Sequence, residues 1–224
     1  MNILFSDIDN TLVYSLRKIH VPYIGADVKN GTVIGGITAA SAELLNRLSK
    51  KIEIVPITAR SLEQYRRIVW PCPIKYAMAL NGAVLLVNGV IDEAWYNETM
   101  SIVKSVKSEL ERAAEVPGFR WVDDIYVYAH FENHDQAQQA YDKFDFEPEK
   151  VKVYVDKCKV YVTAAGLSKK DMVRKFLDRY DYGHSYSAGD SEVDREMEKI
   201  TDMFFKPDAT YSDNFLKQID CREL

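Results

Sequence analysis

The sequence predicts an α/β fold in which a parallel sheet forms the core and a smaller α+β segment is inserted into it. Residues 3–5 and 52–57 are short apolar runs, which are typical of strands buried on both faces of a parallel sheet. A helical pattern separates the two runs. From residue 83 to residue 166 the pattern changes to paired strands with helices between them, which favours a separate antiparallel sheet.

The first half of the predicted core follows a strand–helix–strand order. Thr38 is a favourable N-cap for a helix over residues 39–49, in which leucines recur at helical spacing. A second helix is expected over residues 62–69. A strand over residues 76–80 follows it and ends at the turn residues Asn81-Gly82.

The inserted segment is predicted to contain two hairpins, two helices and one further strand. Asn88-Gly89 is a strong hairpin signal between the first two apolar runs. The expected elements are a hairpin over 83–95, a helix over 99–115, a strand over 121–131, a helix over 134–144 and a hairpin over 151–163. The core pattern then resumes with a helix over 169–180, a strand over 185–188, a helix from 192 and a strand over 203–206. We therefore expect a discontinuous core domain, residues 1–82 and 167–224, and an inserted domain, residues 83–166.

Composition excludes several classes of function. The 224 residues carry 29 basic and 34 acidic side chains, and the resulting net charge of −5 without a basic stripe makes nucleic acid an unexpected partner. No run of about 18 apolar residues occurs, so no membrane-spanning helix and no membrane partner are expected. The three cysteines lie far apart, which disfavours a zinc site or a disulfide framework and fits a reducing cytoplasm.

Two aspartates follow the first predicted strand. Asp7 and Asp9 are expected at the carboxyl edge of the sheet, where open α/β sheets bind their ligands. Two neighbouring carboxylates repel each other unless a cation compensates, so the pair indicates a hard divalent metal. The alternative is a solvated turn, because Asp and Asn are common in turns.

Thr58 and Arg60 follow the second predicted strand and are expected at the same edge. The Thr58 hydroxyl and backbone N–H could both donate to a phosphoryl oxygen, and Arg60 could add a bidentate contact to the substrate. The alternative for Thr58 is a helix N-cap.

Two further groups lie at predicted helix starts. Lys169 and Lys170 occupy the first turn of a helix, where the macrodipole disfavours a cation, so that a carboxylate cluster or a bound phosphate is expected nearby. The alternative is two solvated lysines. Gly189 permits a tight turn after the next strand, and Asp190 and Asp194 follow it at i, i+4 spacing. Plain helix capping is the alternative for these two aspartates.

In this order, the motifs resemble the haloacid dehalogenase (HAD) superfamily. The family pattern is Asp-x-Asp-x-Thr, then Ser/Thr, then Lys, then Gly-Asp-x-x-x-Asp. The chain supplies Asp7-Ile-Asp9-Asn-Thr11, Thr58, Lys169 and Gly189-Asp-Ser-Glu-Val-Asp194. The insertion, entered through Asn81-Gly82-Ala83, is similar to the type 2 (C2) cap of the Cof-like, sucrose-phosphatase-like and phosphomannomutase-like branches. The resemblance implies a Rossmann-like parallel-sheet HAD core with an inserted α+β cap.

The chain departs from the family pattern at two places. Lys170 stands where many relatives carry Gly, which leaves open whether Lys169 or Lys170 is the site lysine, although the spacing favours Lys169. The long segment 14–37 is interpreted as an enlarged flap near the site.

The resemblance also implies a magnesium-dependent phosphatase that acts on a small phosphorylated metabolite, by default a sugar phosphate, as a monomer or small homo-oligomer. Asp7 would be the nucleophile that forms an aspartyl-phosphate, and Asp9 the general acid and base. Mg²⁺ would be held by Asp7, by Asp190 and by the main-chain carbonyl of Asp9, and Asp194 would orient the metal shell. Thr58, Arg60 and Lys169 would bind the phosphate. Asn81 and Gly82 are possible substrate contacts. A sugar phosphomutase, or a catalytically silent binding protein, is the alternative.

Overall fold

The computed structural model describes residues 1–208 and 211–223. The chain divides into two compact units, one formed by Met1–Ile91 and Lys169–Leu224 and the other by Asp92–Ser168. None of the helices within the described residues is long and apolar enough to cross a membrane.

The first unit is built on a parallel sheet with the strand order β14-β13-β1-β5. Its strands are β1 (Asn2–Ser6), β5 (Ile52–Pro56), β13 (Ser185–Ala188) and β14 (Met203–Phe205). The central strand β1 pairs in parallel with β13 and with β5. Ile3, Leu4 and Phe5 are fully buried, as expected for a strand that is covered on both faces.

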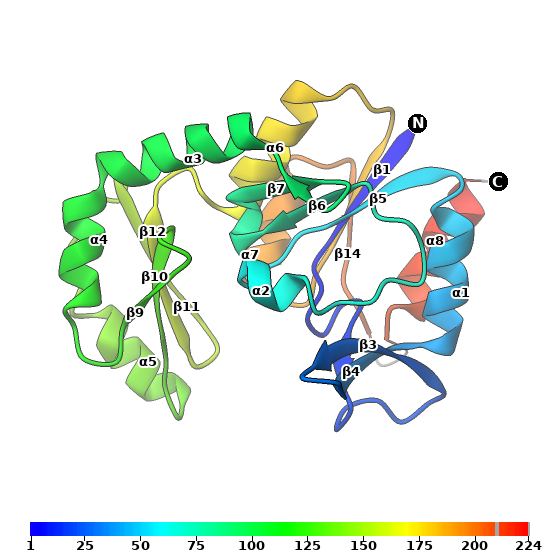
Figure 1. Cartoon of the computed structure of the whole chain (residues 1–224), viewed down its shortest axis with the longest axis horizontal. Helices are drawn as coiled ribbons and strands as arrows, with labels where there is room; N and C mark the ends of the chain where they lie inside the picture. The colour runs from blue at the N-terminus through cyan, green and yellow to red at the C-terminus, as the bar shows by residue number, and fades with distance from the viewer. Residues whose placement is uncertain (209–210, 224) are drawn as a thin grey trace. The chain divides into compact units, whose positions relative to one another are not determined.

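Helices cover both faces of this sheet. Figure 1 shows α1 (Ala39–Leu48) and α8 (Asp213–Arg222) on one side, with α6 (Lys169–Arg179) and α7 (Glu192–Arg195) on the other. Phe5 on β1 packs edge-on against Phe176 of α6, with ring centroids 5.4 Å apart. On the opposite face Phe205 stacks on Phe215 of α8 at 6.1 Å. The sheet therefore lies between two helical layers. A single 3₁₀ turn, Glu196–Lys199, extends α7.

A second sheet extends the core beyond β5. β6 (Tyr76–Ala79) meets the end of β5 through a parallel bridge between Ile57 and Met78. The chain then turns back through a 3₁₀ turn, Leu80–Gly82, so that β7 (Val84–Val87) and β8 (Val90–Ile91) form an antiparallel meander with β6. Residues 83–91, which the sequence assigns to the insertion, therefore belong to the first unit because they pair with a core strand.

The flap segment is a three-stranded antiparallel sheet, for which the sequence predicts no strands. It consists of β2 (Tyr14–Ser15), β3 (Tyr23–Lys29) and β4 (Thr32–Thr38), in the order β2-β4-β3. The register of β3 shifts at Asp27, as in a β-bulge. The far edge of β3 binds the segment after α2 (Leu62–Tyr65), where Val69 N–H donates to Ala26 O at 2.7 Å. This pairing explains why the helix predicted over 62–69 ends at Tyr65.

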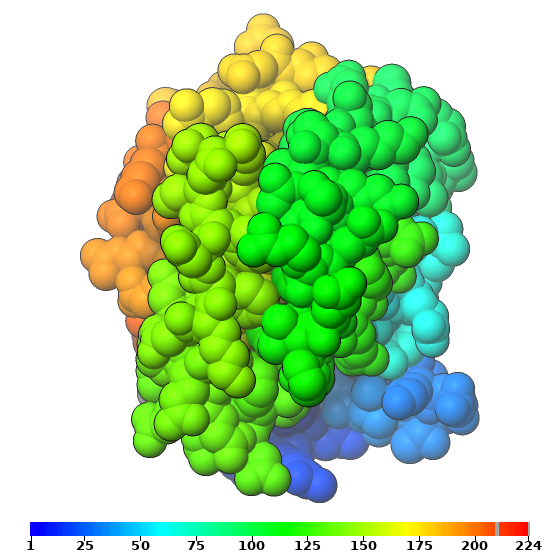
Figure 2. Space-filling model, turned by 90° about the vertical axis from the view of Figure 1, so that its left-hand side faces the viewer, coloured from blue at the N-terminus to red at the C-terminus, as the bar shows by residue number. Residues whose placement is uncertain are grey.

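The second unit is a four-stranded antiparallel sheet with three helices. Its elements are α3 (Glu93–Ser105), α4 (Lys107–Ala114), β9 (Arg120–Val122), β10 (Tyr126–His130), α5 (His134–Tyr141), β11 (Val151–Asp156) and β12 (Lys159–Ala164), and the strand order is β11-β12-β10-β9. In Figure 2 the visible surface of this unit combines its first half, in green, with its second half, in yellow-green.

Three details of the second unit differ from the predictions. The helix expected from Thr99 begins at Glu93, because the Asp92 side chain accepts a hydrogen bond from Trp95 N–H at 2.8 Å and caps it. The helix is also interrupted at Val106. The single strand expected over 121–131 is a hairpin, which turns through Asp123 and Asp124 with φ values of 48° and 56°.

Candidate active site

Asp7 lies directly after β1, at the carboxyl edge of the parallel sheet. Its N–H donates to Ala188 O at 2.9 Å, which continues the pairing of β1 with β13 and fixes the backbone. The side chain is buried, with 8% of its surface exposed. Thr11 Oγ1 donates to Asp7 Oδ2 at 3.3 Å, so the turn after the strand also restrains the carboxylate.

Asp194 reaches Asp7 from the start of α7. Ser191 caps this helix, and its N–H and hydroxyl donate to Asp194 Oδ2 at 3.0 and 2.6 Å. A Cβ at Gly189 would lie 2.1 Å from Asp194 Cβ, so glycine is required for the close approach of Asp194 to the strand end. The spacing from Ser191 to Asp194 has the form of a capping box, a signal in the sequence that identifies Ser191 as a supporting residue.

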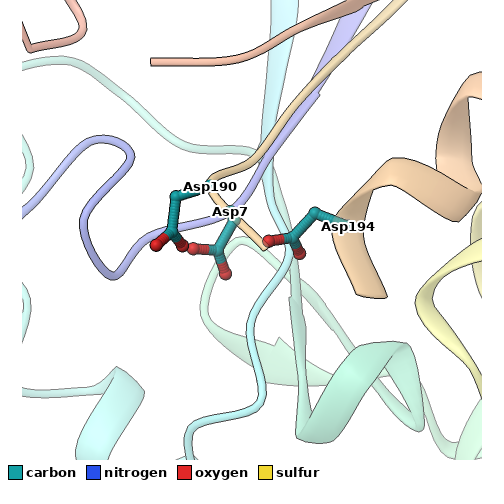
Figure 3. A group of neighbouring side chains, drawn as sticks. All are labelled: Asp7, Asp190 and Asp194. Atoms are coloured by element: carbon teal, nitrogen blue, oxygen red, sulfur yellow. The ribbon is translucent and has the colours of Figure 1, made fainter. Parts of the chain in front are cut away.

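Asp7, Asp190 and Asp194 form the acidic cluster of the site. One carboxylate oxygen from each lies within 4.8 Å of the other two. Figure 3 shows the three side chains converging from two chain segments, the end of β1 and the turn from β13 into α7. Asp194, which is expected from the sequence only in the metal shell, is a member of this group. The Asp9 side chain is not, and points to a different partner.

Lys169 is the cation of the cluster. Its Nζ lies 2.6 Å from Asp7 Oδ1 and 2.6 Å from Asp194 Oδ1, and only 5% of the side chain is exposed. The two carboxylates supply the compensation that a cation in the first turn of α6 requires. Lys170 instead lies 3.7 Å from Asp171 and does not join the cluster. Lys169 is therefore not a solvated lysine.

The cluster contains more negative than positive charge. Burial, together with the charges of Asp194 and Asp9, raises the pKa of Asp7 to about 7, although Lys169 opposes the shift. Burial alone would raise the pKa of Asp194 as well, but Lys169 and the hydrogen bonds from Ser191 lower it. One ammonium group cannot neutralise three neighbouring carboxylates. The surplus of carboxylate oxygens fits a hard divalent cation such as Mg²⁺.

Thr58 lies at the same edge but differs in one respect from the prediction. Its N–H donates to Met78 O at 2.9 Å, because β5 and β6 are joined there, so this N–H cannot bind a phosphoryl oxygen. The buried hydroxyl accepts a hydrogen bond from Arg60 N at 3.2 Å and retains its own proton for donation. The N-cap of α2 is Ser61, so Thr58 does not cap a helix.

Arg60 contacts carboxylates on both sides. Its Nε and Nη2 donate to the two oxygens of Asp9 at 2.8 and 2.7 Å, and its Nη1 lies 2.7 Å from Asp27 Oδ2. Burial alone would lower the pKa of Arg60, but Asp9 and Asp27 outweigh it and raise the pKa. The sequence predicts a contact of Arg60 with substrate, but it gives no signal for Asp27, because a single aspartate in a β-strand has no recognisable motif.

Asn81 and Gly82 form the turn that follows β6. Asn81 N–H donates to Thr58 O at 2.7 Å, and Leu80 N–H donates to Arg60 O at 3.0 Å, so this turn holds the loop that carries Thr58 and Arg60. A Cβ at Gly82 would lie 2.4 Å from Met172 Cβ in α6. The predicted contact of Asn81 and Gly82 with substrate stays a prediction.

No family model matches the chain, and no curated protein matches it in sequence. Among solved structures, the sucrose-phosphatase from Synechocystis sp. PCC6803 in complex with sucrose and phosphate has a TM-score of 0.66 at 13% identity and covers 98% of this chain and 96% of its own. A phosphatase of the haloalkanoate (HAD) enzyme superfamily from Bacteroides thetaiotaomicron has a TM-score of 0.56 at 15% identity, with coverage of 99% and 94%.

A trehalose-6-phosphate phosphatase related protein has a TM-score of 0.54 at 19% identity, with coverage of 98% and 97%. Because these identities are low, the likeness shows the fold. The predicted fold class, an α/β fold with a parallel-sheet core and an inserted α+β unit, is confirmed.

Proposed function

We propose that this chain is a magnesium-dependent phosphomonoester hydrolase of the HAD type that acts on a small phosphorylated metabolite of the sugar phosphate class. The observation that carries the proposal is the cluster at the carboxyl edge of the sheet, in which Asp7, Asp194 and Lys169 are buried and Asp190 is half-buried. The names of the similar structures, a sucrose-phosphatase and a trehalose-6-phosphate phosphatase related protein, support the substrate class.

The acidic cluster provides the oxygen ligands that Mg²⁺ prefers. Asp7 and Asp190 would hold the ion, with the main-chain carbonyl of Asp9, while Asp194 lies close enough to ligate or to orient the shell. When bound, the ion would supply positive charge to the phosphoryl oxygens and to the surplus of carboxylates.

The reaction is proposed to proceed in two displacements. In the first, a carboxylate oxygen of Asp7 attacks phosphorus, the bond from phosphorus to the ester oxygen breaks, and the departing alcohol takes a proton from Asp9. In the second, water attacks the aspartyl-phosphate, gives its proton to Asp9 and releases inorganic phosphate and Asp7. Lys169 and the Thr58 hydroxyl would donate to phosphoryl oxygens, and such prearranged charge supplies most of the catalysis in phosphoryl transfer.

The substrate class is tested by phosphate release from a panel of monoesters. The panel contains p-nitrophenyl phosphate, hexose and disaccharide phosphates, polyol phosphates and nucleotides, each measured with Mg²⁺ and with EDTA. We expect release that requires Mg²⁺ and a higher kcat/KM for sugar phosphates than for nucleotides. The absence of release from every compound would contradict the proposal. Transfer of label between a sugar bisphosphate and a monophosphate, without net release, would identify a mutase.

A further inference from the structure

A carboxylate of the flap reaches the site through Arg60. Asp27 lies at the bulge of β3, and its side chain is 5% exposed. A bridge between Asp27 and Ile68 holds the backbone at this point, and Val28 N–H donates to Arg67 O at 3.2 Å. The carboxylate therefore extends from a backbone segment that is paired on both sides.

Arg60 uses its three nitrogens to join Asp27 to Asp9. Nη1 lies 2.7 Å from Asp27 Oδ2, while Nε and Nη2 bind Asp9 Oδ2 and Oδ1 at 2.8 and 2.7 Å. A planar guanidinium with both ends engaged has one orientation, which is the property that makes arginine suitable for bidentate recognition. The Arg60 side chain is 11% exposed, so surrounding atoms also restrict its movement.

The Asp9 carboxylate differs from the rest of the site in its exposure. Its side chain is 51% exposed, whereas those of Asp7 and Lys169 are 8% and 5% exposed. An exposed aspartate has several accessible rotamers, and proton transfer requires one that is directed at the reacting oxygen. The bidentate contact with Arg60 restricts Asp9 to one of these rotamers.

Asp27 binds Arg60 more closely than it binds its other basic neighbour. Its second oxygen, Oδ1, lies 3.3 Å from Arg67 Nε, but neither atom has a hydrogen-bond partner within the described residues. A buried charge with an unsatisfied oxygen is a poor source of stability. Its contact with Arg60 is therefore better explained by orientation of the guanidinium than by stabilisation of the fold.

We propose that Asp27 is a positioning residue, which orients the Asp9 carboxylate for proton transfer by holding the guanidinium of Arg60. The inference rests on the proposed function, because it assigns Asp27 a part in the proton transfers of Asp9. Without Asp27, Arg60 Nη1 would keep only its long contact of 3.4 Å with Gln64 O, and the guanidinium would no longer hold Asp9 in one orientation.

The test compares Asp27→Asn with wild type on two kinds of ester. For an alkyl phosphate, both displacements depend on Asp9, and we expect kcat/KM to fall about tenfold or more. For p-nitrophenyl phosphate the leaving group departs without a proton, so kcat/KM should stay within about threefold of wild type. Its kcat should fall, because the second displacement still needs Asp9 to activate water, and phosphorylated protein should accumulate in acid-quenched samples. A variant damaged only in its packing would lower kcat/KM for the two esters by the same factor.

Asp220→Asn is the matched control. Asp220 of α8 also bridges two cations, Arg47 Nη2 of α1 at 2.6 Å and Lys51 Nζ, just after α1, at 3.2 Å. We expect this variant to keep the wild-type ratio of kcat/KM for the alkyl phosphate to kcat/KM for p-nitrophenyl phosphate. If this ratio were the same in wild type, Asp27→Asn and Asp220→Asn, the inference would be overturned.

Two further experiments keep the inference testable whatever the first result. If Asp27→Asn does not fold, Arg60→Lys retains the charge but cannot bind two carboxylates with a planar fork, and kcat/KM should fall further for the alkyl phosphate than for p-nitrophenyl phosphate. A crystal structure of Asp27→Asn reports on geometry without activity. In that structure, displacement of Arg60 from Asp9 would support the inference, and an unchanged bidentate pair between Arg60 and Asp9 would refute it.

The failure of the proposed function can be told apart from the failure of the inference. Wild type without activity on any ester would contradict the proposed function alone, and the crystal structure of Asp27→Asn would still test the positioning of Asp9.

Discussion

At the scale of single residues, the site depends on like charges held closer together than they would be in water. Asp7 and Asp194 share the single ammonium group of Lys169, with both contacts at 2.6 Å. The arrangement persists because Ser191 and Thr11 donate hydrogen bonds to the same carboxylates. It also persists because Gly189 leaves the space that Asp194 occupies.

The requirement for Gly189 gives a direct prediction. In Gly189→Ala the new methyl group would lie 2.1 Å from Asp194 Cβ, so Asp194 or the turn must move. We expect a loss of about 1–3 kcal/mol in the free energy of unfolding, as is usual for overpacked buried positions. Phosphate release should fall as well, because Asp194 no longer restrains Lys169. Urea denaturation followed by circular dichroism measures the stability change, and wild-type stability together with wild-type turnover would show that the turn can relax.

The sequence predicts some of these residues better than others. Asp7, Lys169 and Asp190 are predictable because each follows a core strand or begins a helix beside one, and the topology of parallel sheets brings such positions together. Asp27 is not predictable, because its role depends on a β-bulge and a pairing with the segment after α2. The bond from Thr58 N–H to Met78 O depends likewise on the meeting of two strands that are distant in sequence.

At the scale of elements, the functional side chains are carried by segments that are fixed at both ends. β1, β5 and β13 are neighbours in one parallel sheet, and α6 begins at Lys169 itself. Strands with a continuous apolar pattern were predictable, since burial on both faces dictates their composition. The flap strands were not, because Gly25, Gly35 and Gly36 interrupt the alternation that identifies a strand.

The helix α1 depends on a cap that also binds another helix. Thr38 Oγ1 accepts a hydrogen bond from Ser41 N at 3.0 Å and donates to Asp213 Oδ1, in α8, at 2.5 Å. Thr38→Ala should therefore lower the free energy of unfolding by about 1–2 kcal/mol, since it removes the N-cap and one charge-assisted hydrogen bond.

Ser49→Ala, at the other end of the same helix, is the control. Its hydroxyl donates to Asn46 O at 3.1 Å and also hydrogen-bonds with the Cys72 thiol, and because both partners are uncharged the change should stay below about 1 kcal/mol. Equal effects of the two substitutions in urea denaturation would contradict the role assigned to Thr38.

At the scale of the whole molecule, folding, metal binding and pH are linked through Asp7. The pKa of about 7 for this buried carboxyl means that the folded, metal-free protein holds a proton that the unfolded chain has lost. The metal-free protein should therefore lose stability as the pH rises from about 4 to 7. Magnesium binding requires the carboxylate, so it should strengthen over the upper part of the same range.

This linkage predicts a thermal shift that depends on pH. The increase in Tm caused by Mg²⁺ should be small at pH 6 and larger at pH 8, because the apparent affinity is about tenfold weaker when nine in ten Asp7 side chains are protonated. Melting curves at pH 6, 7 and 8, with Mg²⁺ and with EDTA, provide the measurement. A shift that is the same at all three pH values would contradict the assignment of Asp7 as a ligand.

The central claim, that Asp7 is the nucleophile of a magnesium-dependent phosphatase, is tested most directly by phosphate release from wild type and Asp7→Asn. With the best ester and saturating Mg²⁺, we expect wild-type turnover, loss of activity to background in Asp7→Asn, and full activity in Asp220→Asn. Circular dichroism should show that Asp7→Asn is folded, because the amide is uncharged and relieves the repulsion in the cluster. Turnover by Asp7→Asn close to that of wild type would contradict the account.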